Sequence, residues 1–179
     1  MHKILAIGAS NSIHSINRTL ATHVAGLVDD AEVTAIDLND FEMPIFSIDR
    51  EKSDGIPGHA RTFRRLIETH EGVVLSLAEH NGSYSTAFKN VLDWSSRIDG
   101  PLWANKPLFL LSTSPGKRGG ATVMQVALTY FPRMGALIAA HFSLPSFNLN
   151  YSEADGLTKS ELFSDFEVQL DAFQKALDA

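Results

Sequence analysis

Three loops of this chain carry polar side chains in a pattern that suits a small charged ligand. The first, Gly8 to Arg18, is rich in serine and asparagine and leads into a helix-like segment. Free amides at a helix N-terminus bind phosphate, and hydroxyl groups add neutral donors. Ser15 alone would be an ordinary N-cap, but further Ser and Asn residues precede it. Because the G-x-G-x-x-G and G-K-[ST] motifs are missing, we expect this loop to bind a monophosphate rather than a pyrophosphate.

The second loop, residues 78–84, follows an apolar run of the chain and contains glutamate, histidine, asparagine and glycine. A tight loop of this kind can present backbone N–H and C=O groups to a planar ring, with His80 and Tyr84 packed against that ring. The alternative is a solvated turn that leads into a helix. His80 could act as a base, although a single loop histidine is more often an ordinary surface residue.

The third loop, residues 112–120, combines serine and threonine with glycine and proline. Its hydroxyls and amides could reach the rim of the same site. Lys117 and Arg118 bring positive charge to a mainly acidic chain, and that charge could meet a phosphate-bearing second substrate. The alternative is a surface loop with solvated cations, since charged residues are usually exposed.

The composition argues against several other chemistries. The chain has no cysteine, which excludes a thiol nucleophile, a disulfide framework and an iron–sulfur cluster. Its seven histidines show no H-x-x-x-H or H-x-H pairing, and no G-x-S-x-G elbow indicates a hydrolase. The net charge of −6, from 15 basic and 21 acidic residues, disfavours sequence-independent binding of nucleic acid. We therefore expect neither a metal site nor a nucleic-acid partner.

A regular alternation of strands and helices must position the three loops. Apolar runs that indicate strands lie at Lys3–Ile7, Glu32–Leu38, Gly72–Leu77, Pro107–Leu111 and Gly135–Phe142. Apolar residues at helical spacing lie at Ser15–Val28, Gly58–His70, Ser85–Arg97, Ala121–Phe131 and Ser160–Leu177. The long stretch Asn39–Pro57 shows neither pattern, and we expect it to be an irregular lid or partner surface.

This alternation predicts an α/β fold, a doubly wound five-stranded parallel sheet with helices on both faces. In such a sheet, ligands bind at the carboxyl ends of the strands, near the point where the strand order reverses. The three polar loops follow the first, third and fourth strands. We therefore expect them to meet at that edge of the sheet.

The length of 179 residues predicts a single domain that spans residues 1–179. The apolar run at the N-terminus is too short for a secretory signal, and no stretch of 18 apolar residues occurs. We therefore expect a cytoplasmic protein without a membrane partner.

The three loops, in this order, resemble the NADPH-dependent FMN reductase family of flavodoxin-like proteins. Gly8-Ala9-Ser10 followed by Ser15-Ile16-Asn17-Arg18 resembles that family's GS…SxNxxLA phosphate loop. Glu79-His80-Asn81 followed by Lys89-Asn90-Val91-Leu92-Asp93-Trp94 is similar to its PEYNxSxPxxLKNxIDW segment. Ser112-Thr113-Ser114-Pro115-Gly116, with Gly119-Gly120, resembles its closing Ser/Gly loop. The resemblance covers nearly the whole chain.

The chain departs from the family pattern at several positions of these loops. Ala78 and Ser85 stand where the family usually has proline, and His80 stands where it has tyrosine. The first loop has Asn11, Ile13 and His14 where a basic residue is common between the serines. These departures concern substrate choice and flavin affinity more than the fold.

The resemblance implies a sheet of order 2-1-3-4-5, FMN as cofactor and NAD(P)H as co-substrate. It assigns the FMN phosphate to Ser10, Ser12, Ser15, Ile16 and Asn17. It assigns the isoalloxazine edge to Glu79, His80, Asn81 and Gly82, and a further flavin contact to Ser112 and Ser114. No side chain is implied as a catalytic acid or base, because the flavin carries the chemistry, and His80 would only modulate it.

The resemblance further implies a small-molecule electron acceptor, such as a quinone or an azo compound, and a homodimer or homotetramer. The helix Ser85–Arg97 and the stretch Asn39–Pro57 are the candidate contacts between subunits. Two alternatives remain open. One is a flavodoxin-like electron carrier that reacts poorly with NAD(P)H, and the other is a non-redox ligand-binding protein on the same fold.

Overall fold

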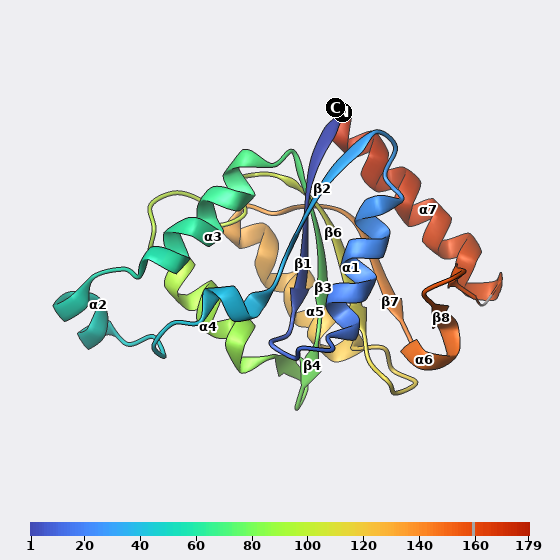
Figure 1. Cartoon of the computed structure of the whole chain (residues 1–179). Helices are drawn as coiled ribbons and strands as arrows, with labels where there is room; N and C mark the ends of the chain where they lie inside the picture. Colours follow the sequence, from blue (N-terminus) through green and yellow to red (C-terminus); the bar gives the residue numbers. More distant parts are fainter. Residues whose placement is uncertain (159) are drawn as a thin grey trace.

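The computed structural model of the chain describes residues 1–158 and 160–179. Its centre is a parallel sheet of five strands in the order β2-β1-β3-β6-β7 (Figure 1). These strands are β1 (His2–Ala9), β2 (Ala31–Ile36), β3 (Gly72–Leu77), β6 (Pro107–Thr113) and β7 (Leu137–Leu144). The predicted flavodoxin-like, doubly wound sheet of order 2-1-3-4-5 is confirmed.

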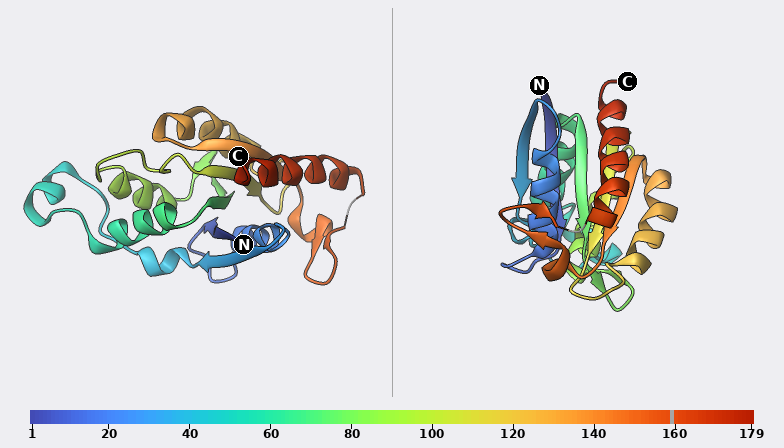
Figure 2. Two further views of the ribbon diagram at one scale, coloured as in Figure 1. Left: turned by 90° about the horizontal axis from the view of Figure 1, so that it is seen from above. Right: turned by 90° about the vertical axis from the view of Figure 1, so that its right-hand side faces the viewer.

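Helices cover both faces of this sheet (Figure 2). On one face lie α1 (Ile16–Gly26) and α7 (Ser160–Leu177). On the other lie α3 (Gly58–Thr69), α4 (Thr86–Ser95) and α5 (Ala121–Tyr130). Within the described residues, no helix combines the length and the apolar character that a membrane crossing requires.

The central strands are buried on both faces, which explains their almost continuous apolar sequence. In β1, Leu5, Ile7 and Ala9 belong to the core under α3, α4 and α5. Ile4 and Ala6, which alternate with them, belong to the core under α1 and α7. Successive side chains of a strand point to opposite faces, so a strand between two helical layers needs apolar residues at every position.

The register of the sheet aligns the ends of the strands that precede the three polar loops. Ala9 of β1 lies beside Leu77 of β3, and Leu77 lies beside Ser112 of β6. The loops after these strands therefore begin at one level of the carboxyl edge, which is the lower edge of the sheet in Figure 1. The three loops meet there, as the sequence predicts.

The stretch Asn39–Pro57 contains regular structure that the sequence pattern does not reveal. It starts within a 3-10 helix, η1 (Leu38–Phe41), and includes the short helix α2 (Ile48–Asp54). Ser47 caps α2 by accepting a hydrogen bond from the Arg50 N–H at 3.2 Å. Because no residue of α2 is buried, its sequence carries no apolar stripe from which a helix could be predicted.

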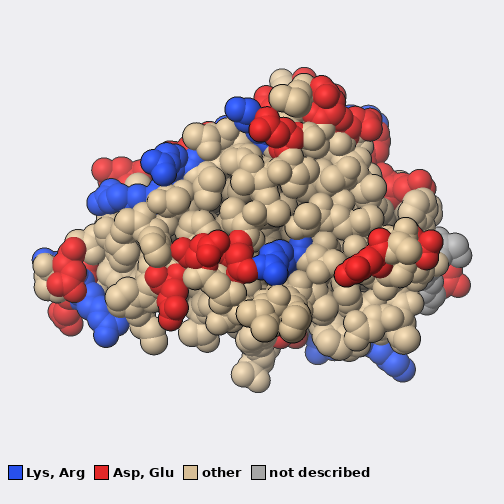
Figure 3. Space-filling view, in the orientation of Figure 1, with Lys and Arg blue, Asp and Glu red and all other residues tan. Residues whose placement is uncertain are grey.

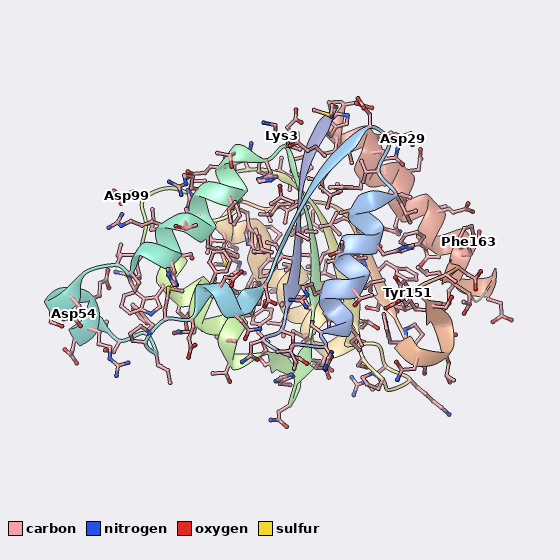
Figure 4. All side chains as sticks on the ribbon, in the orientation of Figure 1. Lys3, Asp29, Asp54, Asp99, Tyr151 and Phe163 are labelled. Atoms are coloured by element: carbon pink, nitrogen blue, oxygen red, sulfur yellow. The ribbon has the colours of Figure 1, made fainter. Side chains whose placement is uncertain are left out.

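Two side chains of α4 hold this stretch against the molecule. Asn90 accepts from the Phe46 N–H at 2.9 Å and donates to the Met43 carbonyl at 3.0 Å. Trp94 is buried, and its indole N–H donates to the Pro44 carbonyl at 2.7 Å. Beyond this attachment the chain extends away from the sheet, and Figure 4 shows Asp54 at the outer end of α2.

Smaller elements complete the fold. Residues 78–84, expected as a plain loop, form a hairpin of β4 (Glu79–His80) and β5 (Ser83–Tyr84). The predicted second strand ends at Ile36 instead of Leu38, because Asp37 accepts from the Asn39 N–H at 2.9 Å and starts η1. The remaining elements are η2 (Phe131–Met134), α6 (Phe147–Asn150), β8 (Tyr151–Ser152) and β9 (Gly156–Leu157).

Candidate functional site

The three loops enclose a cavity of about 270 Å³ at the carboxyl edge of the sheet. Its wall consists of Ser10, Ser12, His14, Ser15, Ile16, Asn17, Ala78, Glu79, His80, Thr113, Ser114 and Pro115. Most of the residues expected from the sequence are therefore brought together. Asn81, Gly82 and Ser112 lie outside this wall.

In the first loop, hydroxyl side chains support the backbone. The Ser10 hydroxyl accepts a hydrogen bond from the Ser12 N–H at 3.2 Å. Ser15 is the N-cap of α1, and its hydroxyl accepts from the Arg18 N–H at 3.1 Å. These bonds give the loop one defined shape, which is what a preformed binding site requires.

At the start of α1, two backbone amides have no partner among the described residues. The N–H groups of Ile16 and Asn17 find no acceptor within the described part of the chain. They belong to the first turn of α1, where a helix has no carbonyl to offer its leading amides. Both residues line the cavity, so an anion placed there would meet two free donors and the positive end of the helix dipole.

The side chain of Asn17 is buried and joins α1 to two strands. It accepts from the Ser76 hydroxyl of β3 at 2.7 Å and donates to the Thr113 carbonyl of β6 at 3.4 Å. The first turn of α1 is thereby fixed to the ends of both strands. The sequence predicts a ligand contact at Asn17, and the structure leaves its backbone amide free for that contact while the side chain supports the fold.

Close packing at the end of β1 fixes the loop from the other side. A Cβ atom on Gly8 would overlap the backbone of Arg18, so only glycine fits where α1 crosses the strand. The Arg18 guanidinium pairs with Asp37 after β2 and donates to the Ile13 carbonyl at 3.1 Å. Arg18 is outside the cavity wall, and its charge is balanced by Asp37.

Asn81 and Gly82 form the turn of the hairpin. Their φ angles are 52° and 78°, and two consecutive positive values are typical of the two-residue type I′ turn, for which Asn-Gly is the favoured pair. The turn carries both residues beyond the cavity wall. Glu79 and His80, which precede it on β4, remain in the wall.

The Glu79 carboxylate anchors the hairpin to α5. Its Oε2 atom accepts from the N–H groups of Thr122 and Val123 at 2.9 and 3.0 Å. The N-cap position of α5 is Gly120, which has no side chain to cap the helix, so Glu79 provides the cap from another element. The carboxylate is therefore engaged and does not face a ligand as a free charge.

Ser85 anchors the other end of the hairpin. Its hydroxyl donates to the Ala9 carbonyl at the end of β1 at 2.8 Å. The same oxygen accepts from the Phe88 N–H at 3.2 Å as the N-cap of α4. The hairpin is thus attached to β1 and α4 on one side and to α5 on the other.

His80 is exposed, and its imidazole has no hydrogen-bond partner in the part of the chain that the structure describes. It separates the cavity from a second one of about 450 Å³. The second cavity is lined by Asn11, Leu38, Asn39, Phe41, Glu42, Met43, Ile45, His80, Thr86, Ala87 and Asn90. The wall of this second cavity combines apolar and amide side chains, which suits a flat and partly apolar molecule.

The third loop contributes to the wall partly through other residues than the sequence predicts. The Ser112 hydroxyl is buried, donates to the Gly119 carbonyl at 2.7 Å and lies 2.8 Å from the Ser143 hydroxyl. It serves the packing between β6, β7 and the loop, and is not directed to the cavity. Ser114 and Pro115 line the cavity, as their position after β6 requires.

The ring of Tyr84 packs between α4 and the chain after α5. It stacks on Phe131 with centroids 5.9 Å apart and meets Phe88 edge-on at 5.8 Å. Burial, with a smaller contribution from Tyr130, raises the pKa of Tyr84 to about 12. Tyr84 is therefore not in the cavity wall, against whose ligand the sequence predicts it to pack.

The cavity wall contains no lysine or arginine. Its ionisable side chains are Glu79, which is bonded to α5, and the imidazoles of His14 and His80. Figure 3 shows acidic and basic groups interspersed over one face, without a continuous basic patch. Among the described residues, no group of three or more His, Asp or Glu side chains could hold a metal ion.

Four wall residues were not among the predicted site residues, namely His14, Ala78, Thr113 and Pro115. Each lies in one of the three polar loops, next to a residue that the sequence does single out. The signal that could have found them is position alone, because each residue of a loop at this edge is a candidate.

Comparison with known proteins agrees with this architecture. Residues 2–148 match the family model of NADPH-dependent FMN reductase. The chain is 30% identical over 124 residues to the NADPH:quinone oxidoreductase of Arabidopsis thaliana, covering 69% of this chain and 59% of that protein. It is 32% identical over 121 residues to a 2-hydroxy-1,4-benzoquinone reductase of Burkholderia sp, covering 66% and 64%. The chain thus spans less than two thirds of the length of these relatives.

Among solved structures, the fold is similar to FerB, a flavoenzyme NAD(P)H:(acceptor) oxidoreductase from Paracoccus denitrificans. The TM-score is 0.78 at 22% identity, and the match covers 99% of this chain and 98% of that chain. This likeness concerns the fold. The family model, by contrast, covers most of the chain, including all three loops of the cavity. The chain therefore belongs to the NADPH-dependent FMN reductase family.

Proposed function

We propose that this chain is an FMN-dependent NAD(P)H oxidoreductase whose acceptor is a quinone or a similar small molecule. The observation that carries the proposal is the cavity in which the free amides of Ile16 and Asn17 lie beside the anchored hairpin. Family membership supports the cofactor, and the names of the two curated relatives support the acceptor class.

The donors of the first loop fit a phosphate monoester. Ser10, Ser12 and Ser15 place hydroxyl groups around the two free amides in the same wall. The one carboxylate of the wall, Glu79, is directed to the start of α5, where two backbone amides bind its Oε2 atom. We assign the phosphate of FMN to this part of the cavity.

The hairpin and the third loop provide the remaining contacts. We assign the edge of the isoalloxazine ring to Glu79 and His80, with Asn81 and Gly82 at the rim and Ser114 opposite; Ser112 supports the third loop. The chemistry that FMN supplies when bound is hydride transfer from a nicotinamide coenzyme and electron delivery to an acceptor. This chain's residues bind and orient the reactants, and the cavity beside His80 gives the second reactant space.

We further propose that residues 1–179 act as one domain in the cytoplasm and form a homodimer or homotetramer. The stretch Asn39–Pro57 and α4 are the candidate contact. Ile45 and Ile48 of this stretch are 68% and 60% exposed, and association would remove this apolar surface from water. Analytical ultracentrifugation of Ile45→Asp and of the wild type tests this assignment. We expect the variant to sediment as a smaller oligomer or a monomer.

The absorption spectrum of the purified chain, before and after incubation with FMN and desalting, tests the function. We expect flavin bands that persist through desalting, are bleached by NAD(P)H without air, and return when benzoquinone is added. Bands that NAD(P)H leaves unchanged would instead indicate an electron carrier. A chain that retains no flavin at excess FMN would overturn both redox functions.

A further inference from the structure

We propose that His14 provides the positive charge that balances the phosphate of FMN, so that retention of FMN depends on pH. This inference rests on the proposed function. A phosphate monoester carries between one and two negative charges near neutral pH, because its second pKa is about 6. The wall around the free amides contains no lysine or arginine to balance that charge.

The imidazoles of the wall are the groups that can become cationic there. His14 lies in the first loop itself, between the Ser12 hydroxyl and the N-cap Ser15, two residues before the free amide of Ile16. His80 lies across the cavity on the hairpin and also borders the second cavity. His14 therefore lines the same cavity as the free amides of α1, and His80 is on the side assigned to the ring.

The other ionisable groups near His14 line two cavities, which share residues of the first loop. His14 also lines a third cavity, of about 380 Å³. The other ionisable residues of that cavity are Arg18, Tyr151 and Glu153. Arg18 is paired with Asp37. Figure 4 shows Tyr151 beside α1, and this third cavity shares His14, Ser15 and Ile16 with the phosphate cavity.

Toward the phosphate cavity, the ionisable neighbours of His14 are Glu79 and His80. Glu79 is bonded to the amides of α5 and belongs to the opposite wall. No permanent cation of the wall therefore takes the place of a protonated His14. The charge available to the phosphate changes when this imidazole gains or loses its proton.

The direction of the pH dependence follows from the gain or loss of this proton by the imidazole. A protonated imidazole donates a charge-assisted hydrogen bond to a phosphate oxygen, whereas the neutral ring offers no net charge. The stabilisation that a protonated imidazole gives to bound FMN is therefore lost as the pH rises and the ring becomes neutral. Histidine side chains change charge between about pH 5 and 8, which makes the loss measurable.

The test compares FMN with riboflavin, which has the same ring and no phosphate. Dissociation constants are measured by quenching of flavin fluorescence between about pH 6.5 and 8.5. For the wild type, we expect the preference for FMN over riboflavin to fall about ten-fold across this range, as expected for one charged hydrogen bond. Riboflavin binding should stay nearly constant.

Three variants identify the responsible group. His14→Gln should have a weaker preference for FMN at low pH and lose the part of the pH dependence that the imidazole contributes. His14→Arg should keep a strong preference at every pH, because its charge does not titrate. His80→Gln should retain the wild-type pH dependence. The phosphate itself titrates in every variant, so differences between variants report the imidazole alone.

The outcomes separate this inference from the proposed function. FMN binding with the same pH dependence in wild type and His14→Gln would overturn the role of His14 and leave the function intact. Loss of the dependence in His80→Gln, rather than in His14→Gln, would do the same. Failure of both flavins to bind at any pH would overturn the function and this inference together. His14 is exposed, so its variants should unfold at the wild-type temperature.

Discussion

The loop after β1 and the hairpin after β3 meet at one cavity, but they present polar groups to it in opposite ways. In the first loop, the side chains of Ser15 and Asn17 are used to hold structure, and backbone amides remain free. In the hairpin, β4 and β5 pair their backbones, and the His80 side chain remains free. The first loop therefore keeps free backbone donors beside its side chains, whereas the hairpin keeps only a side chain free.

This difference follows from local backbone conformation. A helix start always leaves its first amides unpaired, whatever the side chains are. A hairpin satisfies its own amides and directs alternate side chains to each face. The free amides of the first loop do not depend on the identity of the side chains there, whereas a substitution such as His80 for the tyrosine of the family pattern changes what the hairpin presents. We expect differences in substrate choice to reside in the hairpin.

The largest effect is expected from Asn17→Ala, which removes the support of the first loop. The Ser76 hydroxyl would stay buried without its acceptor, and we expect a loss of about 2–3 kcal/mol in the free energy of unfolding. Ser76→Ala is the matched control, because it breaks the same bond but keeps the bond of Asn17 to Thr113, and it should cost about 1 kcal/mol. Denaturant unfolding measures both, and equal losses would contradict the assigned network.

Ile16→Pro tests the backbone donor directly. Proline is tolerated at the first position of a helix, and Ser15 already has the extended conformation that proline requires before it. We expect FMN affinity to fall about ten-fold, since one donor to a charged group is lost, while riboflavin affinity is unchanged. Fluorescence titration measures both constants.

Two controls accompany Ile16→Pro. Ile16→Ala separates the loss of the side chain from the loss of the N–H. Ile48→Pro makes the same change at the first position of α2, far from the cavity, and should leave FMN affinity unaltered. An unchanged FMN constant in Ile16→Pro would show that the amide is not a ligand donor.

A smaller effect is expected from Glu79→Ala, which frees the hairpin from α5. Loss of the cap should lower the free energy of unfolding by about 1 kcal/mol, because two amides of the first turn lose their acceptor. Glu79→Gln keeps an acceptor oxygen and should lose less. Thermal unfolding measures the series, and an Ala variant as stable as the wild type would contradict the anchoring role.

The smallest effect concerns Tyr84, which ends the hairpin. Burial raises its pKa from 10.0 to about 12, so the unfolded chain loses this proton first as the pH rises. The contribution to stability is complete below about pH 10 and is lost as the pH approaches 12. Tyr84 is half-buried, so we expect an effect below about 1 kcal/mol. Chemical unfolding of Tyr84→Phe should show a weaker decline over this range than the wild type.

The fold was predictable to a large extent because burial on both faces leaves a clear mark on the central strands. Leu5 and Ile7 face one helical layer while Ile4 and Ala6 face the other, and such runs indicate strands without further information. The helix α2 was not predictable in the same way. None of its residues is buried, and its position depends on Asn90 and Trp94 of a distant helix.

The sequence by itself determined the order of the elements, the three polar loops and the family to which the chain is similar. Only the tertiary structure decided which groups in those loops face a ligand. Ser112 bonds to Ser143, 31 residues away, and Glu79 bonds to Thr122, 43 residues away. A buried polar group must find a partner wherever the fold brings one, so its direction is a property of the whole molecule and not of its own loop.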